Sequence, residues 1–310
     1  MSMSSLRIVF MGTPEFAVAS LDALVTAGYT IAAVITAPDK PAGRGLRLNE
    51  SAVKKYAVEK GLPVLQPEKL KNPEFIETLR SLQAHLQVVV AFRMLPEVVW
   101  NMPPMGTLNV HGSLLPRYRG AAPINWAVIN GEKETGVTTF RLKHEIDTGN
   151  ILLQDRLPIG ENDTAGDIHD RMMHLGAQLL VRTVKGLEDG SVKEIPQEEL
   201  ADGELPHAPK IFTETCRINW ERTATEVHNL IRGLSPFPGA FTQLHGKTLK
   251  IYRSEKEMEG NLAPGQVDTD KKTFLRFGCA DGCIQVKELQ LEGKKRMLVE
   301  DFLRGYRFEQ

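Results

Sequence analysis

The sequence predicts an α/β protein, with a doubly wound, mostly parallel sheet domain followed by a small β-barrel domain. Up to about residue 189, short apolar runs alternate with amphipathic stretches of helical spacing. That order is typical of a Rossmann-like sheet whose strands are connected by helices. Beyond about residue 210, short strand-like runs follow one another with turn residues between them, which indicates a small barrel.

The apolar and amphipathic runs set the expected elements and boundaries of the first domain. Strands are expected at residues 6–10, 31–36, 63–65, 86–91 and 135–142, and one ending near residue 108. Helices are expected at residues 15–27, 51–60, 73–82, 124–130 and 164–187. We predict a catalytic domain over residues 1–189, a polar, proline-containing linker over 190–209 and a second domain over 210–310.

Composition and charge limit the class of protein. The 310 residues are 42% hydrophobic and 25% charged, with a net charge of -1, so bulk charge predicts no nucleic-acid partner. From His207 onward, however, 17 Lys and Arg stand against 14 Asp and Glu, a mildly basic balance compatible with RNA contact. No apolar run approaches the length of a membrane span. We therefore expect a cytoplasmic, monomeric protein without a membrane partner.

Three cysteines, Cys216, Cys279 and Cys283, give an odd and sparse count. That count argues against a disulfide framework and favours a reducing compartment. Cys279 and Cys283 flank a predicted hairpin turn, and no second Cys/His pair lies near them in the sequence. We therefore predict no metal site.

The strand–turn–helix opening of the chain raises the possibility of a dinucleotide cofactor. The residues after the first strand are Gly12-Thr13-Pro14-Glu15-Phe16. They do not form the G-x-G-x-x-G motif that dinucleotide binding requires. The sequence therefore argues against a nicotinamide or flavin cofactor.

Asn109 and His111 lie two residues apart at the end of an apolar run, just before a loop rich in glycine and proline. In a strand, such residues project to the same side, and the carboxyl ends of strands are where open α/β sheets place their chemistry. An amide can donate to a developing oxyanion, and an imidazole can donate to the same oxygen or move a proton. A second interpretation is structural, with Asn109 capping a turn and His111 a satisfied core histidine.

Asp147 lies in the turn Glu145-Ile146-Asp147-Thr148-Gly149, which follows the strand expected at residues 135–142. A carboxylate in a strand-end turn can face the histidine of a neighbouring strand, where it would stabilise the imidazolium or fix the ring's orientation. Asp and Gly are also common in ordinary turns for backbone reasons. Alone, the turn therefore leaves both interpretations open.

A basic loop follows the strand expected at residues 31–36. Residues 37–47 carry Lys40, Arg44 and Arg47 among two prolines and two glycines, so we expect no regular element there. One interpretation is a solvated surface loop, and the other is a mobile loop that binds a polyanion.

Long stretches of the chain resemble the folate-dependent formyltransferases. They are NVHGSLLPRYRGAAPINWAVINGEKETGVTTF and IDTGNIL in the middle, RIVFMGTPEFAVASLDAL and APDKPAGRGLRL earlier, and DGCIQVKELQLEGKKRM near the end. The resemblance covers nearly the whole chain, and within that family it is to the branch that formylates methionyl-tRNA. It implies 10-formyltetrahydrofolate as formyl donor, initiator methionyl-tRNA as acceptor, no metal, and an OB-like second domain that binds tRNA.

The resemblance also implies roles for particular residues. The implied catalytic residues are Asn109, His111 and Asp147. The implied folate-binding residues are Ser113, Leu114, Leu115 and Pro116, with Phe92 and Arg93, where the family more often has Tyr-Gly. The implied tRNA-binding residues are Lys40, Arg44 and Arg47, and Arg44 foremost.

Two other functions remain open on the sequence alone. A formyltransferase with the same catalytic residues could act on glycinamide ribonucleotide or on an amino-sugar nucleotide. The basic loop and the second domain favour tRNA over these acceptors. A catalytically silent tRNA- or folate-binding protein is the remaining alternative, and the presence of Asn109, His111 and Asp147 argues against it.

Overall fold

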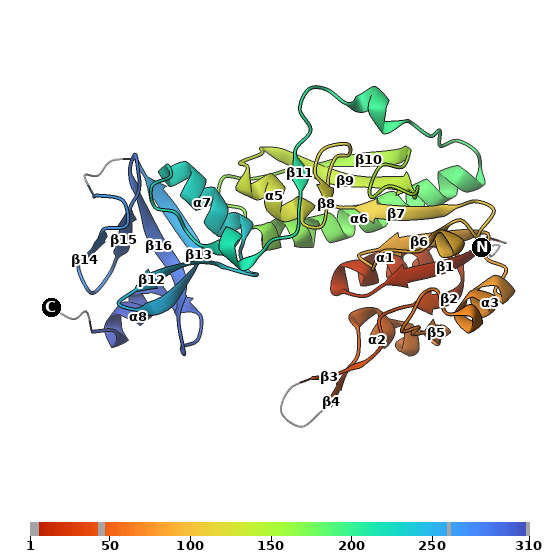
Figure 1. Cartoon of the computed structure of the whole chain (residues 1–310), viewed down its shortest axis with the longest axis horizontal. Helices are drawn as coiled ribbons and strands as arrows, with labels where there is room; N and C mark the ends of the chain where they lie inside the picture. Colours follow the sequence, from red (N-terminus) through yellow and green to blue (C-terminus); the bar gives the residue numbers. More distant parts are fainter. Residues whose placement is uncertain (1–5, 43–46, 259–261, 308–310) are drawn as a thin grey trace. The chain divides into compact units, whose positions relative to one another are not determined.

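The computed structural model describes residues 6–42, 47–258 and 262–307 (Figure 1). The chain divides into two compact units, which are described separately. The first comprises residues 1–119, 136–157 and 170–206, and the second comprises residues 120–135, 158–169 and 207–310.

The first unit is built on a seven-stranded sheet with the order β10-β9-β7-β6-β1-β2-β5. Its strands are β1 (Arg7–Gly12), β2 (Thr30–Ile35), β5 (Val64–Leu65), β6 (Leu86–Val90), β7 (Thr107–His111), β9 (Glu134–Arg141) and β10 (Ile151–Pro158). The five strands from β5 to β7 run parallel, and β9 is antiparallel to β7. The predicted mostly parallel sheet is confirmed, and β6 occupies its centre.

Helices cover both faces of this sheet, as a doubly wound fold requires. The helices here are α1 (Glu15–Thr26), α2 (Ala52–Glu59), α3 (Pro73–Ser81), α4 (Glu97–Trp100) and α6 (Ala165–Glu188). Helices α3 and α4 pack on the face that carries Val9, Met11 and Val89. Helix α6 packs on the opposite face, where a Cβ at Gly176 would lie 3.3 Å from the side chain of Val110.

Local sequence signals explain where these helices begin and end. The Ser51 side chain accepts a hydrogen bond from the backbone of Lys54 and caps α2. The Asn72 side chain caps α3, and Pro73 occupies its first turn, where a missing N–H costs nothing. Gly61, with φ +65°, follows α2 in the left-handed conformation that ends many helices.

The expectation that residues 37–47 contain no regular element is wrong. β3 (Lys40–Ala42) and β4 (Arg47–Asn49) form a short antiparallel pair. Pro41 is tolerated in β3 because each strand of a two-stranded ribbon is an edge strand, where an N–H can be dispensed with. The strand β10 also lies outside the predicted elements, because its apolar start is followed by Gln-Asp-Arg, which lacks strand alternation.

The second unit contains a six-stranded antiparallel sheet that curls around its own core, in agreement with the predicted small barrel (Figure 1). Its strands are β12 (Ala240–Leu244), β13 (Lys247–Glu257), β14 (Val267–Thr269), β15 (Leu275–Gly278), β16 (Cys283–Leu291) and β17 (Met297–Leu298). The pairing of β13 with β16 shifts register on both sides of Arg253. Irregularities of this kind increase the local twist of a sheet.

Three helices belong to this unit, α5 (Pro123–Ile129), α7 (Ala224–Gly233) and α8 (Val299–Gly305). Thr223 and Glu226 form a reciprocal capping box at the start of α7. Phe302 and Leu303 of α8 join the core of the curled sheet, and the sequence prediction did not include this helix. Four short elements complete the described chain: the strands β8 (Arg119–Gly120) and β11 (His207–Ala208), and the 3-10 helices η1 (Gln197–Leu200) and η2 (Thr213–Cys216). Of the two 3-10 helices, η1 lies in the first unit and η2 in the second.

Candidate active site

Asn109 and His111 lie in β7 and project from the same face of the sheet because strand residues alternate. Their neighbours on β9 are Phe140 and Thr138, which pair with Asn109 and His111 respectively. His111 is buried, with 7% of its surface exposed, and Asn109 is half-buried. The amide and the imidazole therefore occur together at the carboxyl end of a strand, as the sequence predicted.

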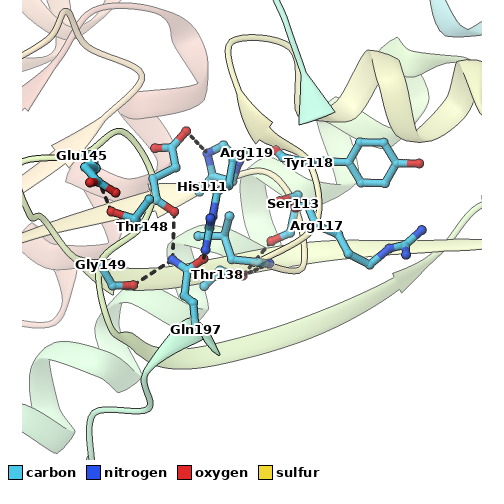
Figure 2. Close-up of polar contacts among 12 residues, drawn as sticks. His111, Ser113, Arg117, Tyr118, Arg119, Thr138, Glu145, Thr148, Gly149 and Gln197 are labelled. Carbon is cyan, nitrogen blue, oxygen red and sulfur yellow. Dashed lines mark hydrogen bonds and ion pairs between the residues drawn. The ribbon is translucent and has the colours of Figure 1, made fainter. Parts of the chain in front are cut away.

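The protonation pattern of His111 follows from its neighbours. Its Nε2 lies 2.9 Å from the carbonyl oxygen of Tyr118 (Figure 2). A carbonyl oxygen only accepts hydrogen bonds, so Nε2 must carry a proton and donate. The atom left to gain or lose a proton, or to donate to a substrate oxygen when protonated, is therefore Nδ1.

Asp147 faces that same atom. Its Oδ2 lies 3.8 Å from Nδ1 of His111, and only 9% of the residue is exposed. The carboxylate therefore lies on the Nδ1 side of the ring, opposite the nitrogen that bonds to the Tyr118 carbonyl. The predicted proximity of a strand-end carboxylate to His111 is thus present.

The turn that carries Asp147 is tightly constrained. Asp147 has φ +55°, in the left-handed region that Asp tolerates better than most residues. A Cβ at Gly149 would lie 1.5 Å from the carbonyl oxygen of Arg141, so only glycine fits there. The backbone conformation therefore favours Asp and Gly in this turn, independently of any role of the carboxylate.

The loop after His111 is held by side chains of β9 and β10. Thr138 Oγ1 donates to the carbonyl of Ser113 at 2.7 Å and accepts from the backbone of Leu115 at 3.1 Å. Gln154 Nε2 donates to the Leu115 carbonyl at 2.8 Å and to Thr138 Oγ1 at 2.9 Å. The Ser113 hydroxyl donates to the Arg117 carbonyl at 2.7 Å. These bonds fix the backbone between His111 and Tyr118.

The four predicted folate-binding residues of this loop differ in their surroundings. The side chain of Leu115 packs in a small core with Phe140 and Ile151, and Pro116 is buried. Ser113 is fully buried, and both its hydroxyl and its carbonyl already have partners in the fold. Leu114 is half-buried, so its side chain is the most accessible of the four.

Phe92 and Arg93 follow the carboxyl end of β6. Phe92 is half-buried against the core beneath the sheet. The Arg93 guanidinium lies over the Phe92 ring, donates to the carbonyl of Glu68 at 2.7 Å and also donates to the carbonyl of Pro67. Burial lowers the pKa of Arg93. In this structure Arg93 ties the backbone of Pro67 and Glu68 to the segment after β6, a role that a Tyr-Gly pair at the same position would lack.

The basic segment is only partly described. Lys40 lies on β3 and is exposed, whereas Arg44 and the side chain of Arg47 fall outside the described residues. The base of this ribbon is anchored, because Asp39 forms an ion pair with Lys54 and accepts a hydrogen bond of 2.7 Å from Gln66. The ribbon thus has a fixed origin near the carboxyl end of β2.

Sequence reasoning missed Gln197, which it assigned to the linker. The residue is fully buried and hydrogen-bonds to the backbone of the Asp147 turn (Figure 2). The only available signal was a single uncharged polar residue between Pro196 and two glutamates, and such a pattern is also common in exposed connectors. A buried role could not be inferred from it.

Two further observations concern metal-binding groups and membrane-spanning helices. Among the described residues, no group of three or more His, Cys, Asp or Glu side chains is arranged to bind a metal ion. None of the helices in the described ranges is long and apolar enough to cross a membrane.

Comparison with known proteins identifies the family. The formyl transferase model matches residues 6–184, and the model of the formyl transferase C-terminal domain matches residues 210–307. The chain belongs to the formyl transferase family.

Individual relatives show which members of this family the chain is similar to. A protein of Bacteroides fragilis named methionyl-tRNA formyltransferase is 56% identical over 99% of this chain and 97% of its own length. A methionyl-tRNA formyltransferase of Phocaeicola vulgatus is 57% identical over 99% of this chain and 98% of its own length. Among solved structures, a sugar 3N-formyl transferase in the presence of dTDP and 5-N-formyl-THF matches with a TM-score of 0.69 and 21% identity. That match covers 94% of this chain and 100% of the other, and at this identity it shows the fold alone.

Proposed function

We propose that this enzyme transfers the formyl group of 10-formyltetrahydrofolate to the amino group of methionyl-initiator tRNA. The observation that carries the proposal is the arrangement of His111, with Nε2 bonded to the Tyr118 carbonyl and Nδ1 facing Asp147. Identity of 56–57% over nearly the full length to relatives named methionyl-tRNA formyltransferase supports the acceptor. The solved relative crystallised with 5-N-formyl-THF supports a folate donor.

The chemistry requires a site that stabilises negative charge on the formyl oxygen. As the substrate amine attacks the formyl carbon, that oxygen gains charge while the bond to the folate nitrogen weakens. The Asn109 amide and a protonated His111 Nδ1 would donate hydrogen bonds to this oxygen. Preorganised donors of this kind act most strongly where water is excluded, and His111 is buried.

Asp147 has two roles in this proposal. Its carboxylate faces Nδ1 of His111 and would hold the imidazole in the orientation that the reaction needs. It would also accept, through water, the proton that the amine loses and pass that proton to the folate nitrogen as this nitrogen leaves. The net reaction moves one formyl group and conserves protons, and no metal or redox group is needed for it.

We propose that the basic ribbon and the second unit provide the tRNA contacts. Lys40, Arg44 and Arg47 would bind phosphates and unpaired bases of the acceptor end, which is the usual way basic loops recognise single-stranded RNA. Leu114, in the loop after His111, and Phe92 would contribute apolar contacts to the folate. The protein would then act in translation initiation in the cytoplasm.

The direct test is formylation of Met-tRNA by the purified protein. Initiator tRNA charged with methionine is incubated with 10-formyltetrahydrofolate, the ester is hydrolysed, and formylmethionine is detected by mass spectrometry. We expect formylmethionine with the wild-type protein and a strongly reduced yield with His111→Ala. Tight tRNA binding without any formylmethionine would instead support a silent binding protein.

A further inference from the structure

Gln197 is the first residue of η1, and its burial contrasts with that of its neighbours. It has 0% of its surface exposed, whereas Glu198, Glu199 and Leu200 are exposed. The chain reaches this point along the start of β10, because Ile195 and Ile151 exchange two backbone hydrogen bonds of 2.8 and 2.9 Å. The Gln197 side chain is therefore buried in the first unit, although the residues that follow it are exposed as in a connecting segment.

The hydrogen-bonding capacity of the Gln197 amide is fully used. Its Nε2 donates to the carbonyls of Asp147 at 2.8 Å and Gly149 at 2.7 Å (Figure 2). Its Oε1 accepts from Nε and Nη2 of Arg119 at 2.9 and 2.6 Å. A primary amide has two N–H groups and two lone pairs, so no capacity remains. The carbonyls only accept and the guanidinium only donates, which fixes the orientation of the amide.

These contacts join the two segments on either side of the His111 ring. Asp147, whose carbonyl Gln197 holds, faces Nδ1. Arg119, which donates to Gln197, directly follows Tyr118, whose carbonyl receives the Nε2 proton. The buried amide of Gln197 therefore connects the turn that faces Nδ1 with the segment that bonds to Nε2.

The Asp147 turn needs such a support. Asp147 has φ +55°, a conformation that persists only where the surroundings hold it. Its flanking residues on the amino side, 143–146, are exposed. The two bonds from Gln197 lie on the carbonyls of the first and last residues of Asp147-Thr148-Gly149, so they fix the turn at both ends.

We propose that Gln197 is a positioning residue for the reaction: the two hydrogen bonds it donates set the place of the Asp147 carboxylate relative to Nδ1 of His111. This inference rests on the proposed formyl transfer for its kinetic readout. Displacement of a catalytic group by about 1 Å can cost roughly a hundredfold in rate, so loss of the two donors should act on kcat.

A double-mutant cycle tests whether Gln197 acts through Asp147. Gln197→Met keeps the length of the side chain but removes the amide, and we expect a kcat lowered roughly tenfold to hundredfold with a KM changed less than about threefold. In the Asp147→Asn background, the same substitution should lower kcat by less than about threefold, because the carboxylate is already absent.

Two further variants test whether the N–H groups of Gln197 account for the loss of activity. Gln197→Glu keeps an oxygen for Arg119 but has no N–H to donate, so it should lose as much kcat as Gln197→Met. Glu199→Gln changes an exposed residue of η1, the element that also contains Gln197, and should leave kcat unchanged. Equal losses from Gln197→Met with and without Asp147 would overturn the proposal, as would full activity of Gln197→Glu.

A measurement independent of activity distinguishes failure of this inference from failure of the proposed function. Amide hydrogen exchange of the peptide covering residues 143–151 should be faster in Gln197→Met than in the wild type and unchanged in Glu199→Gln. If the wild type proves unable to formylate Met-tRNA, this exchange still reports on the turn. Unchanged exchange in Gln197→Met would overturn the positioning role whatever the substrate is.

Discussion

The Nε2 of His111 donates to the carbonyl oxygen of Tyr118 at 2.9 Å, and this contact fixes which imidazole nitrogen remains for chemistry. Nδ1 then faces the Asp147 carboxylate, whose Oδ2 lies 3.8 Å away. The pair is assembled from a strand, β7, and from the turn that follows the neighbouring strand, β9.

Removal of the imidazole should abolish most of the activity. We expect His111→Ala to lower kcat by about a hundredfold or more, as loss of an oxyanion donor usually does. Asn109→Ala should have a similar effect. His174→Ala, an exposed histidine on α6, is the matched control and should retain full activity. Retention of more than about a tenth of the rate by His111→Ala would exclude the proposed role.

Asp147→Asn should remove the charge without disturbing the backbone. Asn tolerates φ +55° as well as Asp does, so stability should be unchanged while kcat falls about a hundredfold. Asp147→Ala should lose a similar rate and also about 1 kcal/mol of stability, because Ala is strained in the left-handed region. Urea unfolding and steady-state rates separate the two effects. Equal stability of the Ala and Asn variants would contradict the argument from backbone strain.

Thr138→Val should loosen the loop after His111. The substitution leaves the buried N–H of Leu115 without its partner, which costs about 1–3 kcal/mol. We expect a lower free energy of unfolding in urea and a higher KM for 10-formyltetrahydrofolate. Thr78→Val, at an exposed position on α3, is the control, with a change within about 0.5 kcal/mol. The prediction fails if the two variants unfold alike.

His228 should make stability depend on pH. Burial lowers its pKa from 6.5, Arg232 and Lys256 add to the effect, and Glu161 opposes it. In the unfolded chain His228 takes up a proton as the pH falls through about 6.5, whereas in the folded protein it stays neutral to a lower pH. The free energy of unfolding is therefore highest above pH 6.5 and declines as the pH falls toward the folded pKa. His228→Gln should show a shallower decline in urea unfolding. Identical pH dependence in both proteins would contradict this prediction.

Arg44→Ala tests the basic segment, whose central residues lie outside the described ranges. If Arg44 contacts a tRNA phosphate, the variant should show a higher KM for Met-tRNA and a salt dependence of tRNA binding reduced by about one counterion. Binding of formylfolate should be unaffected. Arg80→Ala, an exposed cation on α3, is the control. Wild-type tRNA kinetics in Arg44→Ala would identify residues 37–47 as an ordinary surface segment.

Much of the fold could be predicted because its signals are local. The signals for the strand β6 and for the helices α2 and α3 are each contained within a few residues of sequence. The alternation of Asn109 and His111 likewise needed only the expectation of a strand. The prediction failed where a strand depends on its pairing partner: β3 forms because β4, a few residues further on, pairs with it.

The site shows the same division. A catalytic pair could be proposed from Asn109 and His111, whereas the position of Gln197 depends on a fold that brings residues about fifty positions apart into contact. The structure also gives two of the predicted loop residues contacts within the fold. The Ser113 hydroxyl donates to the Arg117 carbonyl. The Leu115 N–H donates to Thr138, and the Leu115 side chain is part of a core. Burial of this kind is a tertiary property that no short motif encodes.

The most direct test of the central claim is the ratio of kcat/KM for alternative formyl acceptors. Methionyl-initiator tRNA, methionyl-elongator tRNA, glycinamide ribonucleotide and an amino-sugar nucleotide would be offered side by side with 10-formyltetrahydrofolate. We expect kcat/KM for methionyl-initiator tRNA to exceed each of the others by at least about a hundredfold, a difference of about 2.7 kcal/mol in transition-state binding. A higher kcat/KM with glycinamide ribonucleotide or the amino-sugar nucleotide would contradict the proposed function.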